Sequence, residues 1–233
     1  MRRKGLITLA VAIAVIALFS LQSCSSSPEK SLLSAYFHAI SLKDTSTMAT
    51  MAINPESIEA QSWKITSVSV EETKPFELAA LNKQELDLKK KLEDHVGPVM
   101  EAEDGKYSAE EQLKDARTGG ARAAAKKKVE EATAKYDQER EVHRQLQKDY
   151  NDAKSAAQRL QDIALFSLSE REMPTVRDMT GTVHSKTVDV QVVDKSGQTK
   201  NYRFSLQQYM LKDEASGYAR NGAWKIVKLE PIA

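Results

Sequence analysis

Few side chains in this 233-residue sequence are spaced for chemistry. The histidines are His38, His95, His143 and His184, and no two of them have the i, i+4 spacing of a helical metal site. The chain also has no glycine-rich phosphate loop and no nucleophile elbow. We therefore expect a protein that is not an enzyme and that uses no cofactor and no metal.

Cys24, the single cysteine, has better-defined chemistry. It follows basic residues at 2–4 and an apolar run at 6–21, the order of a signal sequence with an apolar run slightly too short to span a membrane. Leu21-Gln22-Ser23-Cys24 resembles the bacterial lipobox. The resemblance implies removal of residues 1–23 and acylation of Cys24. Serine rather than aspartate after the cysteine favours the periplasmic face of the outer membrane.

Two alternatives stay open at the N-terminus. Residues 6–23 also fit an uncleaved helix that anchors the chain in the inner membrane, and they fit ordinary secretion in which Cys24 has no role. All three readings place the remaining chain outside the cytoplasm. Because Cys24 has no partner cysteine, no intramolecular disulfide can form, and the fold must depend on its core. Residues 24–27 then form a short tether that keeps the domain near the membrane.

The charge pattern argues against nucleic-acid binding. The formal net charge is +1, and acidic and basic residues are interleaved. The lysine runs at 89–91 and 126–128 lie among glutamates and aspartates, as on a solvated helix face.

The longest regular pattern runs from Leu78 to Ala164, where apolar residues recur with alternating spacings of three and four. A 3.5-residue repeat held this long is typical of a coiled coil. Thr118-Gly119-Gly120 interrupts it and contains the only Gly-Gly in the chain. We therefore predict two long antiparallel helices that reverse at residues 117–121. Gly97, Pro98 and Gly105 predict a kink or unwound segment near 96–107, opposite a continuous second helix.

This alignment places His95 opposite His143 in the seam between the helices. A metal site or a pH switch is one reading, because two imidazoles in one layer resist double protonation. The other reading is a polar layer that lowers stability and specifies the register.

The flanking residues predict a small domain of two helices and several strands. Ser27, Pro28 and Glu29 form a helix start with Ser27 as the cap, and Asp44 is placed to cap a second helix. We expect a strand at 63–72 with a bulge near Thr66 or Ser67. Strands at 183–193, around 202–206 and at 224–229 follow, with a tight turn at Asn221-Gly222. The predicted fold is α+β: a curved antiparallel sheet packs on N-terminal helices, and a coiled-coil hairpin is inserted. The domain comprises 28–75 and 171–233, and the insertion comprises 76–170.

A family resemblance accompanies this pattern. Pro28-Glu29, Tyr36-Phe37-x-Ala39, Lys43-Asp44 with Met48, and Gly222-Ala223-Trp224-Lys225-Ile226 together resemble small bacterial lipoproteins of the nuclear-transport-factor-two-like superfamily. The resemblance implies a strongly curved sheet around a helix, often with an apolar cavity. The residues that would line such a cavity are Tyr36, Phe37, Tyr202 and Phe204. The long hairpin departs from the usual small domain of that superfamily.

Two functions follow. The first is a non-catalytic, membrane-tethered envelope protein whose hairpin is a separable arm that contacts another envelope protein or a second copy of itself. The second is a domain whose cavity binds a small apolar ligand or, as a less favoured variant, carries an enzymatic site. A filled core under Tyr36 and Phe37 favours the first function and a cavity favours the second. Deleting residues 77–166 is expected to leave a folded, anchored domain.

Overall fold

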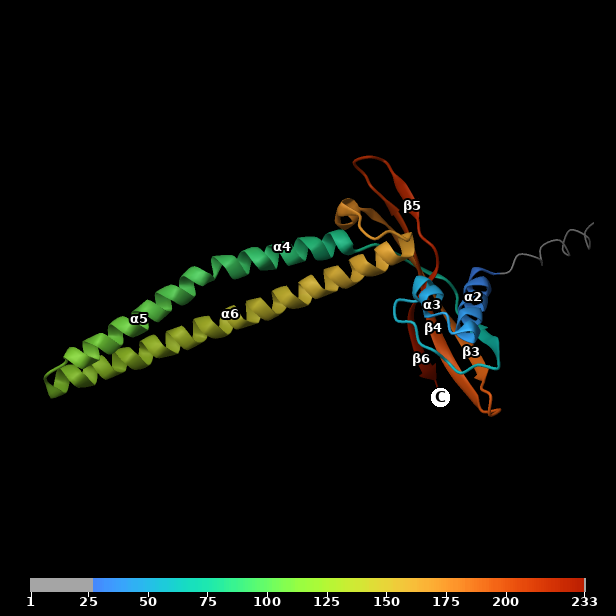
Figure 1. Cartoon of the computed structure of the whole chain (residues 1–233). Coiled ribbons are helices and arrows are strands. Elements are labelled where there is room, and N and C mark those ends of the chain that lie inside the picture. The colour runs from blue at the N-terminus through green and yellow to red at the C-terminus, as the bar shows by residue number, and fades with distance from the viewer. Residues whose placement is uncertain (1–26, 233) are drawn as a thin grey trace, which may run out of the picture.

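The structure is a computed structural model that describes residues 27–232 (Figure 1). It is α+β, as predicted. The signal segment, Cys24 and the tether before Ser27 lie outside the described residues. Among residues 27–232, no helix is both long enough and apolar enough to cross a membrane. The elements are α2 Pro28–Leu42, α3 Thr45–Met51, β1 Ser62–Val68, β2 Glu72–Pro75, α4 Leu78–Asp94, α5 Val96–Asp115, α6 Gly119–Leu168, the 3₁₀ helix η1 Pro174–Asp178, β3 Thr180–Val193, β4 Thr199–Lys212, β5 Ala219–Asn221 and β6 Lys225–Ile232.

The two N-terminal helices begin and end close to the predicted residues. Lys43 ends α2 in the left-handed conformation with φ 55°. Asp44 caps α3 by accepting a hydrogen bond from the Thr47 N–H at 3.0 Å. Ser27 is the N-cap residue of α2, as predicted, but its side chain makes no capping hydrogen bond. Pro28 in the first turn, where its missing N–H costs no helical bond, still fits the helix start.

A long antiparallel ribbon of β3 and β4 forms the centre of the sheet, with 14 residues in each strand. Both β1 and β2 pair with β3, while β5 and β6 pair with β4. The predicted bulge is confirmed, because the β1–β3 register shifts between Ile65 and Ser67. The single strand predicted at 63–72 is wrong: β1 ends at Val68, and β2 begins at Glu72 farther along β3.

The predicted tight turn at Asn221-Gly222 is also wrong. The reversal after β4 lies between Asp213 and Tyr218, where the Asp213 N–H donates to the Tyr218 carbonyl at 2.8 Å. Both β5 and β6 then run along the same edge of β4, with a gap between them at residues 222–224. Gly222 therefore interrupts one edge and does not join two strands.

Two hydrophobic cores lie on opposite faces of the central ribbon. Side chains alternate between the faces of a strand, so Val188 and Val190 of β3 face one way together with Val192, and Val183 faces the other. The first core packs α2 and α3 on one face. The second core packs the base of the helical hairpin and η1 on the other. Buried residues of the second core are Phe76, Leu78, Ala157, Ala164, Leu165, Leu168, Val176, Met179, Val183, Tyr209 and Leu211.

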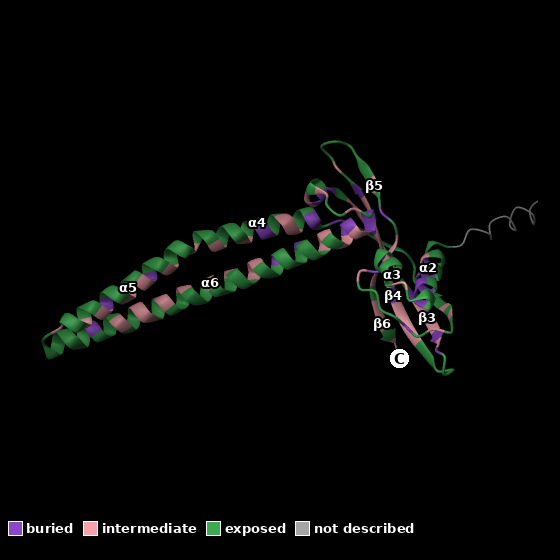
Figure 2. Cartoon of the chain, in the orientation of Figure 1, coloured by how far each residue is buried: buried purple, intermediate pink, exposed green. Residues whose placement is uncertain are grey.

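The hairpin of α4, α5 and α6, called the arm below, extends far from the sheet (Figure 1). The kink is confirmed: α4 ends at Asp94, α5 begins at Val96, and α6 continues opposite them as one helix of 50 residues. The break lies just before the predicted segment. Its position puts Pro98 in the first turn of α5, where a proline is tolerated. Figure 2 shows most of the arm exposed, with buried positions concentrated in the domain and at the arm's base.

Contacts along the arm agree with the predicted register. The His95 and His143 rings stack with centroids 5.9 Å apart. Toward the tip, the Lys128 ammonium donates to Gln112 Oε1 at 3.1 Å. In the predicted alignment His95 lies directly opposite His143, and Gln112 lies two residues from the position opposite Lys128. The turn begins after Asp115, and Thr118 caps α6 by accepting a bond from the Ala121 N–H at 3.2 Å.

Tyr209 makes the second core sensitive to alkaline pH. Burial raises the pKa of its phenol from 10.0 to about 12. A pKa that is higher in the folded state contributes stability that is present below pH 10 and is lost as the pH rises toward 12. We expect the free energy of unfolding to fall by about 2 kcal/mol over this range, and Tyr209→Phe to show a smaller fall. Urea denaturation at graded pH measures both, and equal pH slopes in the two proteins would contradict the assignment.

Candidate functional site

The arm is the candidate site, and it is joined to the sheet through Ser167. This residue, near the end of α6, is 1% exposed and fills the gap between β5 and β6. Its hydroxyl accepts the Tyr209 N–H at 3.1 Å and donates to the Ala223 carbonyl at 2.9 Å. Its own carbonyl accepts the Ala223 N–H at 2.8 Å. Ser167 thus satisfies backbone groups that a neighbouring strand would otherwise satisfy.

A second connection fixes the two helices at the arm's base. Arg177 of η1 donates from Nη1 to Glu85 of α4 at 2.8 Å and from Nε to Gln161 of α6 at 2.7 Å. Asn82 also accepts from Nη1, at 3.1 Å. Glu85 is buried, so the guanidinium compensates a carboxylate held away from water. These two connections, together with the second core, set the direction in which the arm leaves the sheet.

A polar layer crosses the arm where α4 meets α5. His95 Nε2 lies 3.0 Å from Glu139 Oε2, and the His143 ring stacks on His95. The Nδ1 atoms of both histidines are buried and have no hydrogen-bond partner in the described residues. The structure therefore brings together the two histidines that were predicted to share a layer. Within residues 27–232, no group of three or more histidine, cysteine, aspartate or glutamate side chains is placed to hold a metal ion.

The distal part of the arm, residues 93–145, is called the distal arm, and it exposes large apolar side chains. Val96, Met100 and Tyr107 on α5 are 45%, 58% and 59% exposed. Their i, i+4 and i+11 spacing puts them along one side of the helix. The inward positions of this region are small, since Ala102, Ala109 and Ala125 are the buried residues. The distal arm therefore buries little of its own apolar surface and presents some of it to the outside.

The four predicted cavity residues belong to the first core. Tyr36 and Phe204 are fully buried, and their rings meet edge to face at 6.1 Å. Phe37 stacks on Trp63 at 4.7 Å, and Tyr202 packs against this cluster while partly buried. The Tyr36 hydroxyl donates to the Glu56 carbonyl at 3.0 Å, and burial raises the pKa of its phenol. The space beneath Tyr36 and Phe37 is thus occupied by aromatic side chains.

A polar cluster around His184 was not predicted from the sequence. His184 Nδ1 lies 2.7 Å from Glu71 Oε1, and Nε2 lies 3.2 Å from Thr182 Oγ1. Lys186 binds the other Glu71 oxygen at 3.0 Å and lies 3.6 Å from Glu29 at the start of α2. Hydrogen bonds from His184 and Lys186 lower the pKa of the Glu71 carboxyl.

The order hydroxyl, imidazole, carboxylate in this cluster is that of an activated nucleophile. Lys186, however, binds the same Glu71 carboxylate and ties it to Glu29 at the start of α2. We assign the cluster a structural role that links α2, β2 and β3. The alternation of Thr182, His184 and Lys186 on one face of a strand was the signal available in the sequence.

No protein-family model, curated protein or solved structure matches the chain. The site must therefore be interpreted from its own geometry. Cys24, the predicted lipidation site, lies outside the described residues.

Proposed function

We propose that the protein is a non-catalytic lipoprotein of the bacterial cell envelope that is tethered through Cys24 and contacts another protein with its arm. The tether rests on the signal segment and lipobox-like sequence, which favour the periplasmic face of the outer membrane. An inner-membrane anchor at residues 6–23 is the alternative. The kinship with nuclear-transport-factor-two-like lipoproteins is likewise a proposal, and the curled sheet over α2 is compatible with it.

The observation that carries the proposal is the placement of the arm. The start of α2, where the tether joins, and the tip of the arm lie at opposite ends of the molecule (Figure 1). At 1.5 Å per residue, the 50 residues of α6 span about 75 Å. A domain held near a membrane by its N-terminus would therefore carry the tip well away from that surface.

The rigidity of the base supports a role in contact and argues against an idle extension. Arg177, Ser167 and the second core hold the arm in one direction, and such ordering is costly if nothing uses it. The exposed Val96, Met100 and Tyr107 offer apolar area to a partner. The filled core around Tyr36 favours this function over a ligand-binding cavity beneath that residue.

A trimmed arm tests the proposal. Residues 93–145 are replaced by a short Gly-Ser turn, which keeps the second core, Arg177 and Ser167. A full chain that carries a photoreactive amino acid at position 107 is crosslinked in native membranes, and the full chain without that amino acid is the control. We expect the chain with the photoreactive amino acid to yield a specific crosslinked species. In affinity capture, we expect the trimmed protein to lose the partner found in that species.

Two controls separate the arm from the anchor. A variant with Val96, Met100 and Tyr107 changed to glutamine keeps the arm and should weaken capture. Cys24→Ala should abolish palmitate labelling, whereas the trimmed arm should still be labelled. A trimmed protein that keeps every partner would refute the arm function, and a wild type that takes up no palmitate would refute the lipid anchor.

A further inference from the structure

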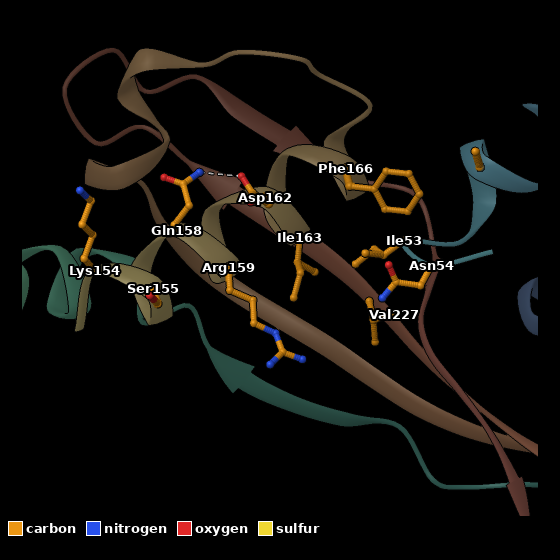
Figure 3. Close-up of a pocket in the computed structure, with 11 residues that line it drawn as sticks. Ile53, Asn54, Lys154, Ser155, Gln158, Arg159, Asp162, Ile163, Phe166 and Val227 are labelled. Atoms are coloured by element: carbon orange, nitrogen blue, oxygen red, sulfur yellow. Dashed lines mark hydrogen bonds between the residues drawn. The ribbon is translucent and has the colours of Figure 1, made fainter. Parts of the chain in front are cut away.

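A cleft of about 800 Å³ lies where the arm meets the domain. It opens between α3 with the residues that follow it, the last third of α6, and β6 (Figure 3). Its volume falls within the range of small-molecule sites. It lies apart from the distal arm and from the core around Tyr36. Lining residues are Ala49, Ile53, Asn54, Lys154, Ser155, Gln158, Arg159, Asp162, Ile163, Phe166 and Val227.

The cleft has an apolar wall. Ile163 and Phe166 of α6 lie on one side, and Ile53 and Val227 lie across from them (Figure 3). All four side chains are only half buried. Lys225 contacts this wall, since its ammonium lies 4.7 Å from the Phe166 ring centroid and donates to the Thr50 carbonyl at 2.7 Å. The exposed apolar surface of this preformed cleft favours a ligand with an apolar body.

One cation without an assigned partner stands beside this wall. Arg159 extends from α6 into the opening, on the same side of the helix as Ile163 (Figure 3). It forms no ion pair and no side-chain hydrogen bond with any residue between 27 and 232. Asp162 accepts from Gln158 Nε2 at 2.7 Å. The Lys154 ammonium lies 5.8 Å from the Tyr150 ring centroid and points away from Arg159 and Ile163 (Figure 3).

These features select the charge of the ligand. A guanidinium offers two parallel N–H donors that match a carboxylate. A single unpaired arginine balances one negative charge, and the nearby Asp162 disfavours a dianion such as a phosphate monoester. The wall begins one helical turn from Arg159, at Ile163. The head and the body of the ligand must therefore be directly connected.

We propose that this cleft binds an amphiphile with a single carboxylate head and an unbranched apolar tail, the chemistry of a fatty acid. Arg159 holds the carboxylate, Asn54 lies across the opening, and the tail lies along Ile163, Phe166 and Val227. The bound molecule would contact the segment after α3, together with α6 and β6, at once. This site is independent of the contact proposed for the arm.

Photolabelling of the full chain in phospholipid nanodiscs tests the site. The probe is dodecanoic acid with a diazirine in its chain, and adducts are located by mass spectrometry and normalised to adducts on the nanodisc lipid. We expect wild type to be labelled at 163–166 and at Val227. Arg159→Gln should reduce this labelling about tenfold, the loss of one charge-assisted hydrogen-bonded pair.

Matched controls separate the head from the tail. Lys148→Gln, at an exposed lysine of α6 outside the cleft, should leave the labelling unchanged. Arg159→Lys should retain part of the labelling. The diazirine-bearing alcohol of the same length should label wild type no more strongly than the acid labels the Arg159→Gln variant. Equal labelling by acid and alcohol, equal labelling of wild type and Arg159→Gln, or no adducts in the cleft would each overturn the proposal.

Discussion

Gly222→Ala is expected to lower the free energy of unfolding by about 3 kcal/mol, the upper part of the range for overpacking a filled interior. A Cβ atom at this position would lie 2.3 Å from Ser167 Oγ and 2.9 Å from the Ser167 carbonyl oxygen. The hydroxyl cannot move away cheaply, because it bonds the Tyr209 N–H and the Ala223 carbonyl. The strain therefore falls on the connection between α6 and the sheet.

Gly105→Ala is the matched control. Nothing lies within 4 Å of a Cβ built on Gly105, and the residue is inside α5. Alanine there should stabilise the protein by up to about 1 kcal/mol, because glycine is a poor helix former. Denaturant titrations of both variants measure the difference. Similar stability of Gly222→Ala and wild type would show that Ser167 does not hold the arm in the way described.

Deleting residues 77–166 is expected to destroy cooperative folding of the β3–β4 end of the domain. The deletion removes Leu78, Ala157, Ala164 and Leu165 from the second core. It leaves Tyr209, Leu211 and Met179 uncovered, and each such side chain loses roughly 1.5–3 kcal/mol of burial. The sum is comparable to the whole stability of a typical domain. The separable arm predicted from the sequence is therefore only its distal part.

The trimmed protein that lacks 93–145 supplies the comparison. It keeps every buried residue of the second core and should unfold in one transition near the wild-type midpoint. Near-ultraviolet circular dichroism and urea titration of both deletions report on packing and stability. If the 77–166 deletion unfolds as sharply as the trimmed protein, the second core adds little to the domain.

The sequence predicted best what depends on neighbours along the chain. The arm, its turn near Gly119, its kink just before Pro98 and its histidine layer all follow from a local repeat and from residues with strong backbone preferences. Asp44 and the bulge after Ile65 were predicted for the same reason. Ser27 was predicted at the correct N-cap position, but the hydrogen bond of its side chain could not be predicted, because helix starts tolerate several arrangements and Pro28 already fits this one.

The second core could not be predicted in this way. Val183 and Val188 belong to one strand yet face opposite sides, so a single inward phase cannot describe β3. Which face each half buries is decided by α2 and by the arm, which lie far apart in the sequence. The turn at Asn221-Gly222 failed for a related reason: that glycine is required by the close approach of Ser167 and not by a reversal.

The cleft combines residues from three regions that no local pattern connects. Ile53 follows α3, Arg159 belongs to α6, and Val227 belongs to β6. Nothing about Arg159 in the sequence distinguishes it from the other basic residues of a charged helix. Its lack of a partner becomes visible only when the helices and strands are assembled. The filled core around Tyr36 likewise required the structure, since aromatic residues at that spacing fit a cavity wall and a packed interior equally well.

The position of the arm between β2 and β3 also bears on the order in which the chain assembles. Pro75 pairs with Thr182, so about a hundred residues must be closed into a loop before this ladder forms, at a cost of about 2 kcal/mol more than a loop one-tenth as long. The helical hairpin relies on local contacts and can form first. Once formed, it brings the ends of that loop together. The arm would then hold the two strand ends together during folding. Substitutions near its tip would slow the pairing of β2 with β3, even where they leave the stability of the folded domain unchanged.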